Sequence, residues 1–172
     1  MNADDSERQP TGAEESAACG VGTMVIMIGI PGSGKSTFCH EKLPWMTVIS
    51  LDLLGTRRRE DRMLAETLEK HLSCVIDNTN VSRAERAKFI AAGKAAGYRI
   101  VGYYLRSSLA ECLKRNAQRV GKARIPDAGV CGRAAQLERP ARTEGFDELF
   151  YVSIVNGSFN ISPWSEEPPP ER

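Results

Sequence analysis

The sequence predicts an α/β fold with a doubly wound, mostly parallel sheet. Short apolar runs, each as long as a buried strand, alternate along the chain with longer segments of helical periodicity. Strands and helices in alternation are the pattern of consecutive βαβ units, whose strands lie parallel. In addition, the first apolar run leads directly into a glycine-rich motif that opens a helix, so the fold is expected to begin with a strand, a tight turn and a helix.

The glycine-rich motif at residues 24–37 predicts a phosphate-binding loop. Residues 24–28 read MVIMI, the expected strand, and from Gly29 onward GIPGSGKS fits G-x-x-x-x-G-K-[ST]. Glycines let backbone N–H groups face phosphate oxygens, the lysine reaches the β- and γ-phosphates, and the serine hydroxyl can ligate Mg²⁺. The helix expected over 35–43 adds its positive N-terminal end.

A glycine turn that fits this pattern by chance is the alternative, but the strand and the helix that the motif requires both flank it. The motif therefore predicts that the chain binds a nucleoside triphosphate, taken to be ATP, together with Mg²⁺. The residues predicted to hold the nucleotide are Gly29, Pro31, Gly32, Ser33, Gly34, Lys35, Ser36 and Thr37. Among them, Ser36 is also a predicted metal ligand and Lys35 a predicted catalytic residue.

Further strands and helices follow the motif in alternation. Strands are expected at 46–50, 73–77, 98–105 and 149–155, and helices at 57–72, 83–96 and 109 to about 120. Two of these helices begin with a serine followed three residues later by a glutamate, Ser82 with Glu85 and Ser108 with Glu111, which predicts two capping boxes. The segment between the last helix and the last strand is rich in turn signals and is expected to form alternating turns.

Composition and charge suit one domain with two polar ends. The 172 residues carry a formal net charge of +1, but residues 1–20 and 165–172 together hold eight of the acidic and two of the basic residues. Both ends are predicted to be disordered tails because they have few apolar residues. Residues 21–164, the predicted domain, then carry +7, which suits a polyanionic ligand, although any nucleotide-binding protein is somewhat basic.

The start of the chain and its cysteines bear on location. No basic stretch followed by an apolar segment is present, so neither a signal peptide nor a membrane anchor is expected. The five cysteines are odd in number and include no C-x-x-C pair, and the two histidines, His40 and His71, are far apart. Neither a disulfide framework nor a zinc site follows. This cysteine usage predicts the cytoplasm or another reducing intracellular compartment.

Two aspartates follow predicted strands and are the candidate carboxylates of the site. Asp52 comes directly after the strand at 46–50, at the strand end where ligands bind in open α/β sheets. It is predicted to accept the proton of an acceptor hydroxyl, with a capping aspartate of the next helix as the alternative. Asp77 ends the strand at 73–77 and is predicted to hold Mg²⁺ or one of its waters, with ordinary Asp-Asn-Thr-Asn turn chemistry as an equal alternative.

A stripe of basic residues is predicted along the helix that begins at 109. At 100° per residue, Arg115, Arg119 and Lys122 share one face, opposite an apolar face that includes Leu109 and Val120. Arginines that close over phosphates stabilise the negative charge of a transition state, so Arg115 and Arg119 are predicted catalytic residues. A solvated basic face is the alternative.

Segments spread over most of the chain match one known family. They are GIPGSGKSTF at 29–38, Asp52 with the following Leu-Leu-Gly, VIDNTN at 75–80, RAERAKFIAAGKAAGY at 83–98, RNAQR at 115–119, IPD at 125–127 and LERPARTEGFDE at 137–148. Together they resemble the P-loop kinase domain of polynucleotide 5′-hydroxyl kinases and their close bacterial relatives. The resemblance implies a kinase-type P-loop NTPase fold with a helical lid and an ATP-dependent kinase activity. Its acceptor would be a nucleic-acid 5′ end or a nucleotide.

By the same resemblance, Lys35 and Ser36 bind phosphate and Mg²⁺, Asp52 is the general base, and Arg115 and Arg119 belong to the lid. Two features depart from the family. Leu51 stands where the polynucleotide kinases commonly have an arginine before the base, a place that the run Arg57–Arg59 is a candidate to fill, and the D-x-D-G-T signature of the phosphatase domain often fused to them is absent. A 3′-phosphatase activity is therefore not expected.

Two other functions stay open beside that of a polynucleotide kinase. One is a small-molecule kinase of the same fold, such as the zeta-toxin-like or antibiotic phosphotransferases, which would use Asp52 equally well. The other is a nucleotide-binding protein with little transfer activity. The set of Lys35, Asp52 and Arg115 argues against that second option, because a protein that only binds a nucleotide has no need of a base.

Overall fold

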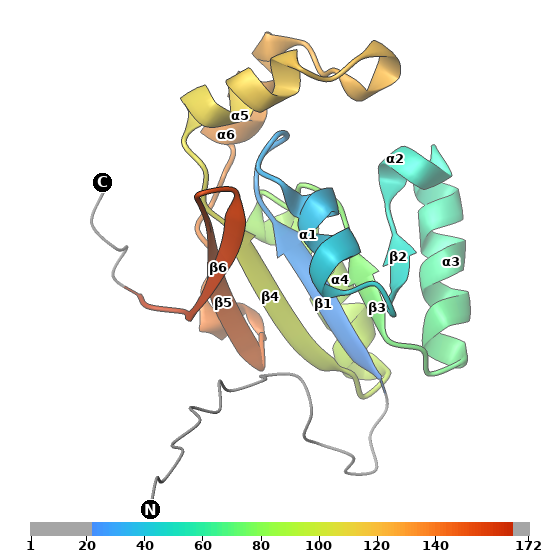
Figure 1. The fold of residues 1–172 in the computed structure, drawn as a ribbon. Helices are drawn as coiled ribbons and strands as arrows, with labels where there is room; N and C mark the ends of the chain where they lie inside the picture. The colour runs from blue at the N-terminus through green and yellow to red at the C-terminus, as the bar shows by residue number, and fades with distance from the viewer. Residues whose placement is uncertain (1–21, 167–172) are drawn as a thin grey trace, which may run out of the picture.

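The computed structural model describes residues 22–166, which form one six-stranded sheet with helices on both faces (Figure 1). The strands are β1 (Thr23–Ile28), β2 (Thr47–Ile49), β3 (Cys74–Ile76), β4 (Arg99–Leu105), β5 (Glu148–Val155) and β6 (Ser158–Pro163). Their order in the sheet is β2-β3-β1-β4-β5-β6, with the first five parallel and β6 antiparallel to β5. The predicted mostly parallel α/β sheet is confirmed.

In the described part of the chain, six α-helices connect the strands. They are α1 (Lys35–Lys42), α2 (Leu51–Leu54), α3 (Arg57–Glu69), α4 (Arg83–Ala95), α5 (Leu109–Ala117) and α6 (Asp127–Ala135). The tail predicted at 1–20 lies outside the described residues, as does most of the one predicted at 165–172. Ser165 and Glu166 are described, and their carbonyl groups accept hydrogen bonds from Arg139.

Alternate residues of β1 serve two cores, one on each face of the sheet. Met24, Ile26 and Ile28 are fully buried on the face that α3 and α4 cover. Val25 and Met27 lie on the other face, where they pack against α1. A central strand that is buried on both faces needs an apolar residue at every position, which explains the unbroken run MVIMI.

The carboxyl ends of β1, β3 and β2 lie side by side at one edge of the sheet (Figure 1). The register aligns Ile26 with Ile76, and Ile76 with Ile49. The glycine-rich loop follows β1, Asp77 follows β3, and the turn that carries Asp52 follows β2. The fold therefore brings the three predicted parts of the site to the edge where open α/β sheets bind ligands.

Helices α5 and α6 pack on each other and form a lid over the same edge (Figure 1). A small apolar core joins the lid to the glycine-rich loop. Its buried members are Ile30, Val81, Cys112 and Val130. The buried side chain of Asn116 fixes the connection between the two helices, because its Nδ2 donates to the carbonyl group of Ile125 at 2.6 Å while its Oδ1 accepts from the N–H of Ile125 at 3.1 Å.

The lid helix α5 is three residues shorter than expected, and the predicted basic stripe is wrong in consequence. The helix ends at Ala117, so Arg119 and Lys122 lie beyond it and share no helical face with Arg115. Val120, which the periodicity places on the apolar face, is 84% exposed. An apolar pattern forms a helix only where a partner surface covers it, and nothing in the described part of the chain covers Val120.

Two elements lie where the sequence analysis expects turns or no regular structure. Helix α6 occupies part of the segment of expected turns and begins directly after Pro126. Strand β6 follows a tight turn at Asn156 and Gly157, whose φ angles are both positive, 51° and 78°. An Asn-Gly pair of this kind favours a two-residue hairpin, so this dipeptide is the sequence signal that would have predicted β6.

Two further predictions at helix ends are wrong, the capping box at Ser82 and the end of α3. Ser82 accepts from the N–H of Glu85 at 3.2 Å, but the carboxylate of Glu85 accepts from the N–H of Val81 instead of completing the predicted capping box. That carboxylate also pairs with an arginine of α6, a long-range contact that a local pattern does not contain. The capping box at Ser108 is present in both directions. Helix α3 ends at Glu69, before the expected residue 72.

A fully buried arginine ties α4 to the segment before β5. Arg86 donates two hydrogen bonds to the carboxylate of Glu144, at 2.6 and 2.8 Å, and others to the carbonyl groups of Val81 and Glu138. A buried guanidinium group needs such a set of partners to offset its desolvation. Glu144, through its carboxylate, and Glu138, through its carbonyl group, thus join α4 to the segment 137–148, whose sequence resembles the kinases.

Candidate active site

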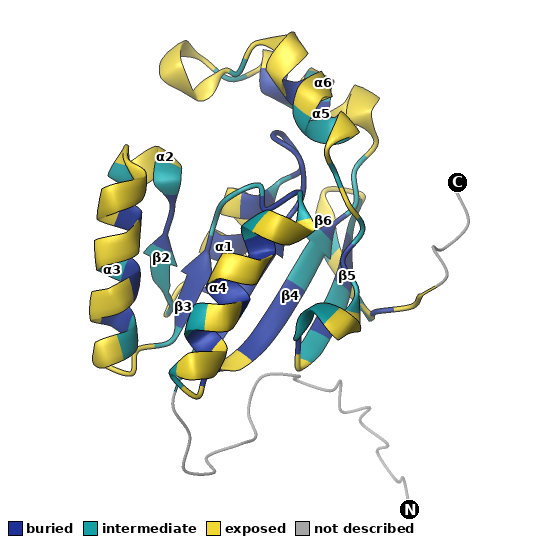
Figure 2. Cartoon of the chain, turned by 180° about the vertical axis from the view of Figure 1, so that it is seen from behind, coloured by how far each residue is buried: buried dark blue, intermediate teal, exposed yellow. Residues whose placement is uncertain are grey.

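The glycine-rich loop, residues 29–34, lies between β1 and α1 and is mostly buried beneath the lid (Figure 2). Gly32 and Gly34 have φ angles of 84° and 100°, in the region that favours glycine. A Cβ atom on Gly32 would also come within 2.4 Å of the carbonyl oxygen of Cys112 in α5. The shape of the loop and its contact with the lid therefore depend on glycine, as a backbone phosphate cradle requires.

Lys35 opens α1, and its side chain folds back over the loop. Its Nζ donates to the carbonyl groups of Gly29 at 2.9 Å and Ile30 at 3.0 Å. Burial lowers the pKa of Lys35 from its ordinary value to about 8, although the charge of the nearby Asp77 opposes the shift. The amine is thus held at the loop, where a phosphate group would restore its full positive charge.

Asp77 follows β3 and faces Ser36 of α1. Burial raises the pKa of Asp77 above its ordinary value, more than a hydrogen bond from Ser36 and the charge of Lys35 lower it. Its Oδ1 atom is buried and accepts no hydrogen bond from the described residues. A carboxylate oxygen without a partner, beside a serine hydroxyl, is an oxygen pair that suits Mg²⁺.

The rest of a magnesium site would have to come from the nucleotide and water. Within the described residues, no group of three or more His, Cys, Asp and Glu side chains could hold a metal ion alone. Mg²⁺ in nucleotide sites is bound by one or two protein oxygens together with phosphates and waters, so the pair of Ser36 and Asp77 fits that ion.

Asp52 lies in the first turn of α2, exposed at another wall of the site. The N-cap residue of this short helix is Ser50, and the N–H of Leu51 donates to Oδ1 of Asn78 at 2.9 Å. The side chain of Ser50 makes no capping hydrogen bond, but Asp52 is not at an N-cap position, and the N-cap of the next helix, α3, is Thr56. The carboxylate of Asp52 is close enough to Asp77 that its negative charge adds to the raised pKa of Asp77.

A cavity of about 310 Å³, called the larger cavity below, collects most of the predicted site residues. Those that line it are Pro31, Gly32, Gly34, Lys35, Ser36, Asp52, Asp77 and Arg119. Among the other predicted residues, Gly29, Ser33, Thr37 and Arg115 are not in its lining. Its remaining walls come from Leu51, Arg57, Asn78, Thr79, Glu85, Ile125 and Arg133.

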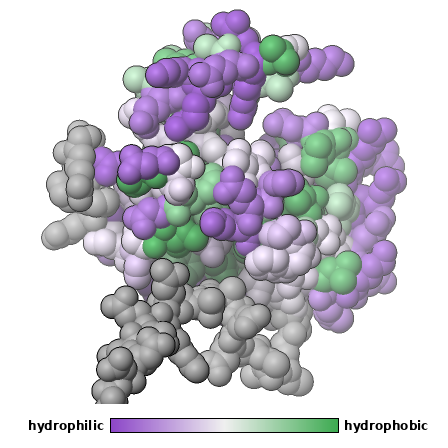
Figure 3. Space-filling view, in the orientation of Figure 1, coloured by the Kyte–Doolittle hydropathy of each residue, from purple (hydrophilic) through white to green (hydrophobic). Residues whose placement is uncertain are grey.

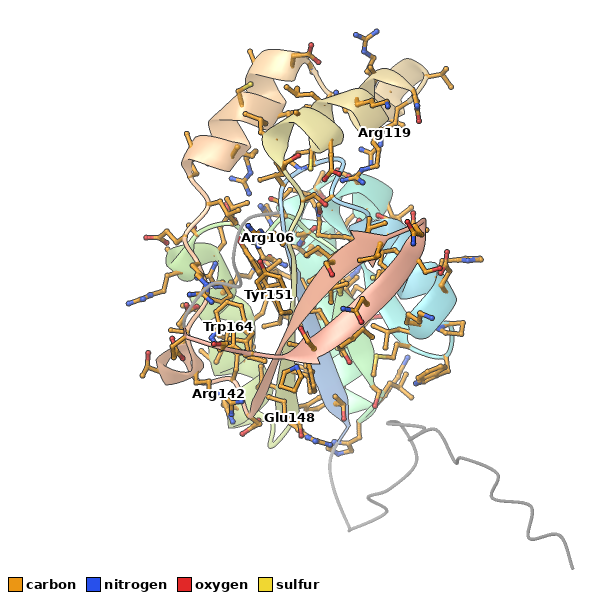
Figure 4. The ribbon with its side chains drawn as sticks, turned by 60° about the vertical axis from the view of Figure 1, so that its left-hand side comes forward. Arg106, Arg119, Arg142, Glu148, Tyr151 and Trp164 are labelled. Carbon is orange, nitrogen blue, oxygen red and sulfur yellow. The ribbon has the colours of Figure 1, made fainter. Side chains whose placement is uncertain are left out.

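The two predicted lid arginines lie in different surroundings. Arg119, just beyond the end of α5 (Figure 4), lines the larger cavity, and its charge acts on both Lys35 and Asp77. Arg115 instead donates its Nε–H to the carbonyl oxygen of Gly32 at 2.7 Å. It therefore fastens the lid to the glycine-rich loop from the side.

A further arginine, Arg133, reaches the larger cavity from α6. It donates to the carboxylate of Glu85 in α4 at 2.9 Å and to the hydroxyl of Thr79. Burial favours a higher pKa for Glu85, but the hydrogen bond and charge of Arg133 outweigh it and lower that pKa. Arg133 is not among the predicted site residues, because turns are expected from the sequence where α6 forms and a single arginine among turns carries no signal.

This combination of features defines a class of protein. A buried lysine on a glycine-rich loop, carboxylates after two neighbouring parallel strands and a helical lid with arginines are found together in P-loop kinases, and this chain is one of them. The AAA domain model matches residues 55–140, which is half of the chain, from the turn before α3 to the segment after α6. The chain belongs to the AAA domain family.

Three curated relatives match about three quarters of the chain. Transcription factor bHLH140 of Arabidopsis thaliana is 28% identical and covers 74% of the chain. L-seryl-tRNA(Sec) kinase of Methanococcus maripaludis is 26% identical over 72% of the chain, and the bifunctional polynucleotide phosphatase/kinase of Schizosaccharomyces pombe is 27% identical over 73%. The chain spans 16%, 56% and 32% of the lengths of these three proteins, so it corresponds to a part of each.

Solved structures share the fold at lower sequence identity. A gluconokinase from Sinorhizobium meliloti 1021 aligns with a TM-score of 0.54 and 18% identity, covering 80% of this chain and 85% of that one. Kti12 from Chaetomium thermophilum, solved in complex with ADP-AlF3, aligns with a TM-score of 0.59 and 14% identity, covering 76% and 88%. Among the helices of residues 22–166, none has the length and apolar character needed to cross a bilayer.

Proposed function

We propose that this chain is a phosphotransferase that moves the γ-phosphate of ATP to a hydroxyl acceptor and uses Mg²⁺. Lys35 and the N–H groups of the glycine-rich loop bind the phosphates. Ser36 and Asp77 hold Mg²⁺, which would offset negative charge on the phosphate oxygens when bound. Asp52 accepts the proton of the acceptor hydroxyl, and Arg119 stabilises the charge of the transferring phosphoryl group from the lid side. Arg115 positions the loop through Gly32.

The observation that carries this proposal is the convergence of Lys35, Asp77 and Asp52 on one cavity. Asp52 is not the N-cap residue of its helix, and its negative charge lies beside the phosphate-binding side chains. A carboxylate there weakens the binding of an anionic nucleotide, so it is a cost to a protein that only binds one. The cost is explained if the carboxylate serves as a base.

For the acceptor, we propose a 5′-hydroxyl end of a polynucleotide. Residues 21–164 carry a formal charge of +7, and Arg57–Arg59 open α3 beside the larger cavity. Hydrophilic side chains gather over α3 and over the lid, which flank the edge of the sheet where the site lies (Figure 3). The three arginines at the start of α3 and the net positive charge of residues 21–164 favour a polyanion over a neutral acceptor. The polynucleotide phosphatase/kinase among the relatives supports the same choice.

A small hydroxylated molecule is the second candidate acceptor. The larger cavity has the size of a small-ligand site, and a gluconokinase shares the fold. Asn78, Thr79 and Glu85 in its wall offer the mixture of hydrogen-bond donors and acceptors that sugar hydroxyl groups require.

A transfer screen with γ-labelled ATP and Mg²⁺ tests the proposal and separates the two acceptors. The panel contains 5′-hydroxyl DNA, 5′-hydroxyl RNA, nucleosides, sugars and sugar acids. Label is expected on the polynucleotide ends, and it should disappear with EDTA and in Lys35→Ala, whose lysine is needed for transfer. Label on a sugar or sugar acid alone would replace the first acceptor by the second. Nucleotide binding without label on any acceptor would overturn the phosphotransferase proposal.

We also propose that residues 21–164 act as one domain in the cytoplasm or another reducing intracellular compartment. Within the described residues, Cys39, Cys74, Cys112 and Cys131 are free thiols, and three of them are buried. Free thiols support a reducing environment.

A further inference from the structure

A second cavity of about 150 Å³, the smaller cavity, adjoins the larger one. Both cavities are lined by Arg57, Asn78, Thr79, Glu85 and Arg133. The smaller cavity adds Asn80, Ala84, Lys88 and Phe89 to its lining. The glycine-rich loop, Lys35 and Asp77 line only the larger cavity. The smaller cavity therefore extends the site on the side away from the phosphate-binding residues.

A fully buried carboxylate lies behind this shared wall. Oε1 of Glu60, in α3, accepts from Nδ2 of Asn78 at 2.6 Å. Its Oε2 accepts from Arg57 at 2.9 Å and from Lys88 at 3.5 Å, and Lys88 pairs more closely with the carboxylate of Asp61 in the same helix α3. All three partners line the smaller cavity, so this one carboxylate contacts a large part of its polar wall.

Asn78 connects the same carboxylate to the proposed base. While its Nδ2 donates to Glu60, its Oδ1 accepts from the N–H of Leu51, the first residue of α2. Asp52 is the next residue along that helix. Glu60 is thus two hydrogen bonds away from the turn that carries Asp52.

Burying a carboxylate is costly unless its partners compensate it, and an apolar side chain would fill the same place at lower cost. Glu60 is 0% exposed, whereas Arg57 is 57% exposed at the side chain and Lys88 42%. In the described structure Arg57 donates one hydrogen bond to Glu60, which leaves other N–H groups of its guanidinium for a ligand. The carboxylate therefore orients Arg57, which remains accessible, and shares Lys88 with Asp61.

We propose that the smaller cavity receives the part of the acceptor next to the reactive hydroxyl, and that Glu60 is the positioning residue of this acceptor subsite. Glu60 orients Arg57 in its wall, holds Lys88 there together with Asp61 and, through Asn78, fixes the turn that carries Asp52. The two cations suit an acceptor with an anionic oxygen group near the hydroxyl, either a phosphodiester or a carboxylate. The proposal rests on the phosphotransferase function proposed above.

Filling the smaller cavity tests its role as the acceptor subsite. Ala84, exposed on α4, lines only this cavity, and leucine is a good helix former, so Ala84→Leu obstructs it without a fold penalty. Ala87→Leu, exposed on the same helix and lining neither cavity, is the matched control. Ala84→Leu should raise the acceptor KM about tenfold or more while the ATP KM stays constant. Equal acceptor KM values in the two variants would overturn the placement.

Acceptors matched in their hydroxyl group test the ligand class. A 5′-hydroxyl dinucleotide is compared with the nucleoside, and a sugar acid with its neutral sugar. In whichever pair the chain phosphorylates, the charged acceptor should have the lower KM. Arg57→Gln should remove most of that preference. An equal KM for charged and neutral members would overturn the anionic class.

Removing the charge of Glu60 tests its positioning role. Glu60→Gln should lower kcat about 10- to 100-fold, the range for residues that orient a catalytic group, with ATP affinity unchanged. Glu66→Gln, an exposed residue of the same helix, should leave both constants unchanged. A purely structural role of Glu60 would instead lower the Tm and weaken ATP binding together with transfer.

A second variant keeps this test valid if Glu60→Gln folds poorly. In Glu60→Gln with Asn78→Asp, the new carboxylate accepts from the N–H of Leu51 and from the glutamine amide, while the glutamine carbonyl accepts from Arg57. Every hydrogen bond is kept with one pair reversed. Asn78→Asp alone brings two carboxylates together and should be the worst of the three. A double variant that is as slow as Asn78→Asp would overturn the proposed coupling of Glu60, through Asn78, to the turn that carries Asp52.

Hydrogen exchange at the N–H of Leu51 reads the same coupling without any acceptor. Exchange should be faster in Glu60→Gln and return to the wild-type rate in the double variant. If the wild type transfers phosphate to nothing, the phosphotransferase proposal fails, and this exchange still decides whether Glu60 orders α2. Unchanged exchange in Glu60→Gln, together with an unchanged kcat where transfer is observed, would overturn the role of Glu60.

Discussion

Lys35 and Asp77 have protonation equilibria that a bound nucleotide would change. Burial lowers the pKa of Lys35 to about 8 and raises the pKa of Asp77, so each is shifted toward its neutral form in the free chain. A phosphate beside Lys35 and a magnesium ion beside Asp77 both favour the charged form. Binding of MgATP should therefore raise the pKa of Lys35 and lower that of Asp77, and near or above pH 8 it should be coupled to proton uptake by Lys35.

The pKa of Lys35 predicts how transfer depends on pH. Above about pH 8 the free chain loses the proton of this amine, and a neutral amine attracts phosphate poorly. A pH profile of kcat/KM for ATP should fall above pH 8, whereas kcat should hold to higher pH because bound phosphate raises the pKa. A flat kcat/KM profile up to pH 10 would contradict this.

The free energy of unfolding should change with pH in the opposite direction. Between pH 8 and 10.5 Lys35 is protonated in the unfolded chain but neutral in the folded one, so the contribution of Lys35 to the free energy of unfolding rises with pH.

Asp52→Asn separates a base from a structural aspartate. Asparagine keeps the size of the side chain, Asp52 is not at the N-cap position, and Asn78 already accepts from the N–H of Leu51, so the stability should change by less than about 1 kcal/mol. An amide cannot take up the acceptor proton, so the transfer rate should fall about 10²- to 10⁴-fold. Thermal unfolding measures the stability, single-turnover transfer measures the rate, and an ATP titration checks that nucleotide affinity is unchanged. A normal transfer rate would show that another residue is the base.

The lid and the glycine-rich loop behave as one packed element in this structure. Gly32 lies so close to the carbonyl group of Cys112 that no side chain fits between them, and Arg115 bonds to the carbonyl group of Gly32. The lid is therefore docked on the loop at Gly32 and through the apolar core that includes Ile30 and Cys112, and this docking places Arg119 at the cavity. A change in the lid should therefore affect the bound phosphates in two ways, through the glycine-rich loop that Arg115 holds and through the position of Arg119.

Alanine variants of the two lid arginines should differ in kind. Arg119→Ala removes a cation from the cavity wall and should lower kcat about 10²- to 10⁴-fold. Arg115→Ala removes a contact that holds the loop and should act mainly by raising the ATP KM. Lys122→Ala, an exposed lid residue outside both cavities, is the control. Steady-state kinetics with both substrates varied decides; the same kinetic defect in both variants would contradict the distinction.

At the scale of the whole molecule, the charge lies unevenly along the chain. Residues 21–164 carry +7 against +1 for the full sequence, and α3 begins with three arginines in succession. Positive charge at a helix N-terminus opposes the helix dipole, so Arg57–Arg59 add an electrostatic cost to α3. The side of the molecule where α3 begins is also the side where the cavities lie, which suits a ligand with many negative charges.

If the acceptor is a polynucleotide, its binding should weaken steeply with salt. Each phosphate contact releases counterions, so the acceptor KM should rise at least about tenfold between about 50 and 200 mM salt. Arg58→Glu with Arg59→Glu, residues that line neither cavity, should raise the acceptor KM more than the ATP KM. Lys42→Glu, in the last turn of α1, should have little effect. A salt-independent acceptor KM would indicate a small neutral acceptor instead.

The sequence by itself determines the parts of this protein that depend on neighbouring residues. The run MVIMI and the motif from Gly29 to Ser36 define a strand, a tight loop and a helix, because strand burial, glycine conformations and phosphate geometry are all local requirements. The alternation of apolar runs and helical segments likewise determines the parallel sheet, and with it the edge where Asp52 and Asp77 meet the loop.

Only the tertiary structure decides which distant residues complete the site. Arg133 and Thr79 are 54 residues apart, and Glu60 and Asn78 are 18 apart, yet each pair is joined by a hydrogen bond in or behind the cavity walls. The end of α5, and with it the separation of Arg115 from Arg119, also depends on packing against the loop and α6. Periodicity reports which face of one element is apolar, but a buried charge is located by the partners that compensate it, and those partners come together only when the elements pack.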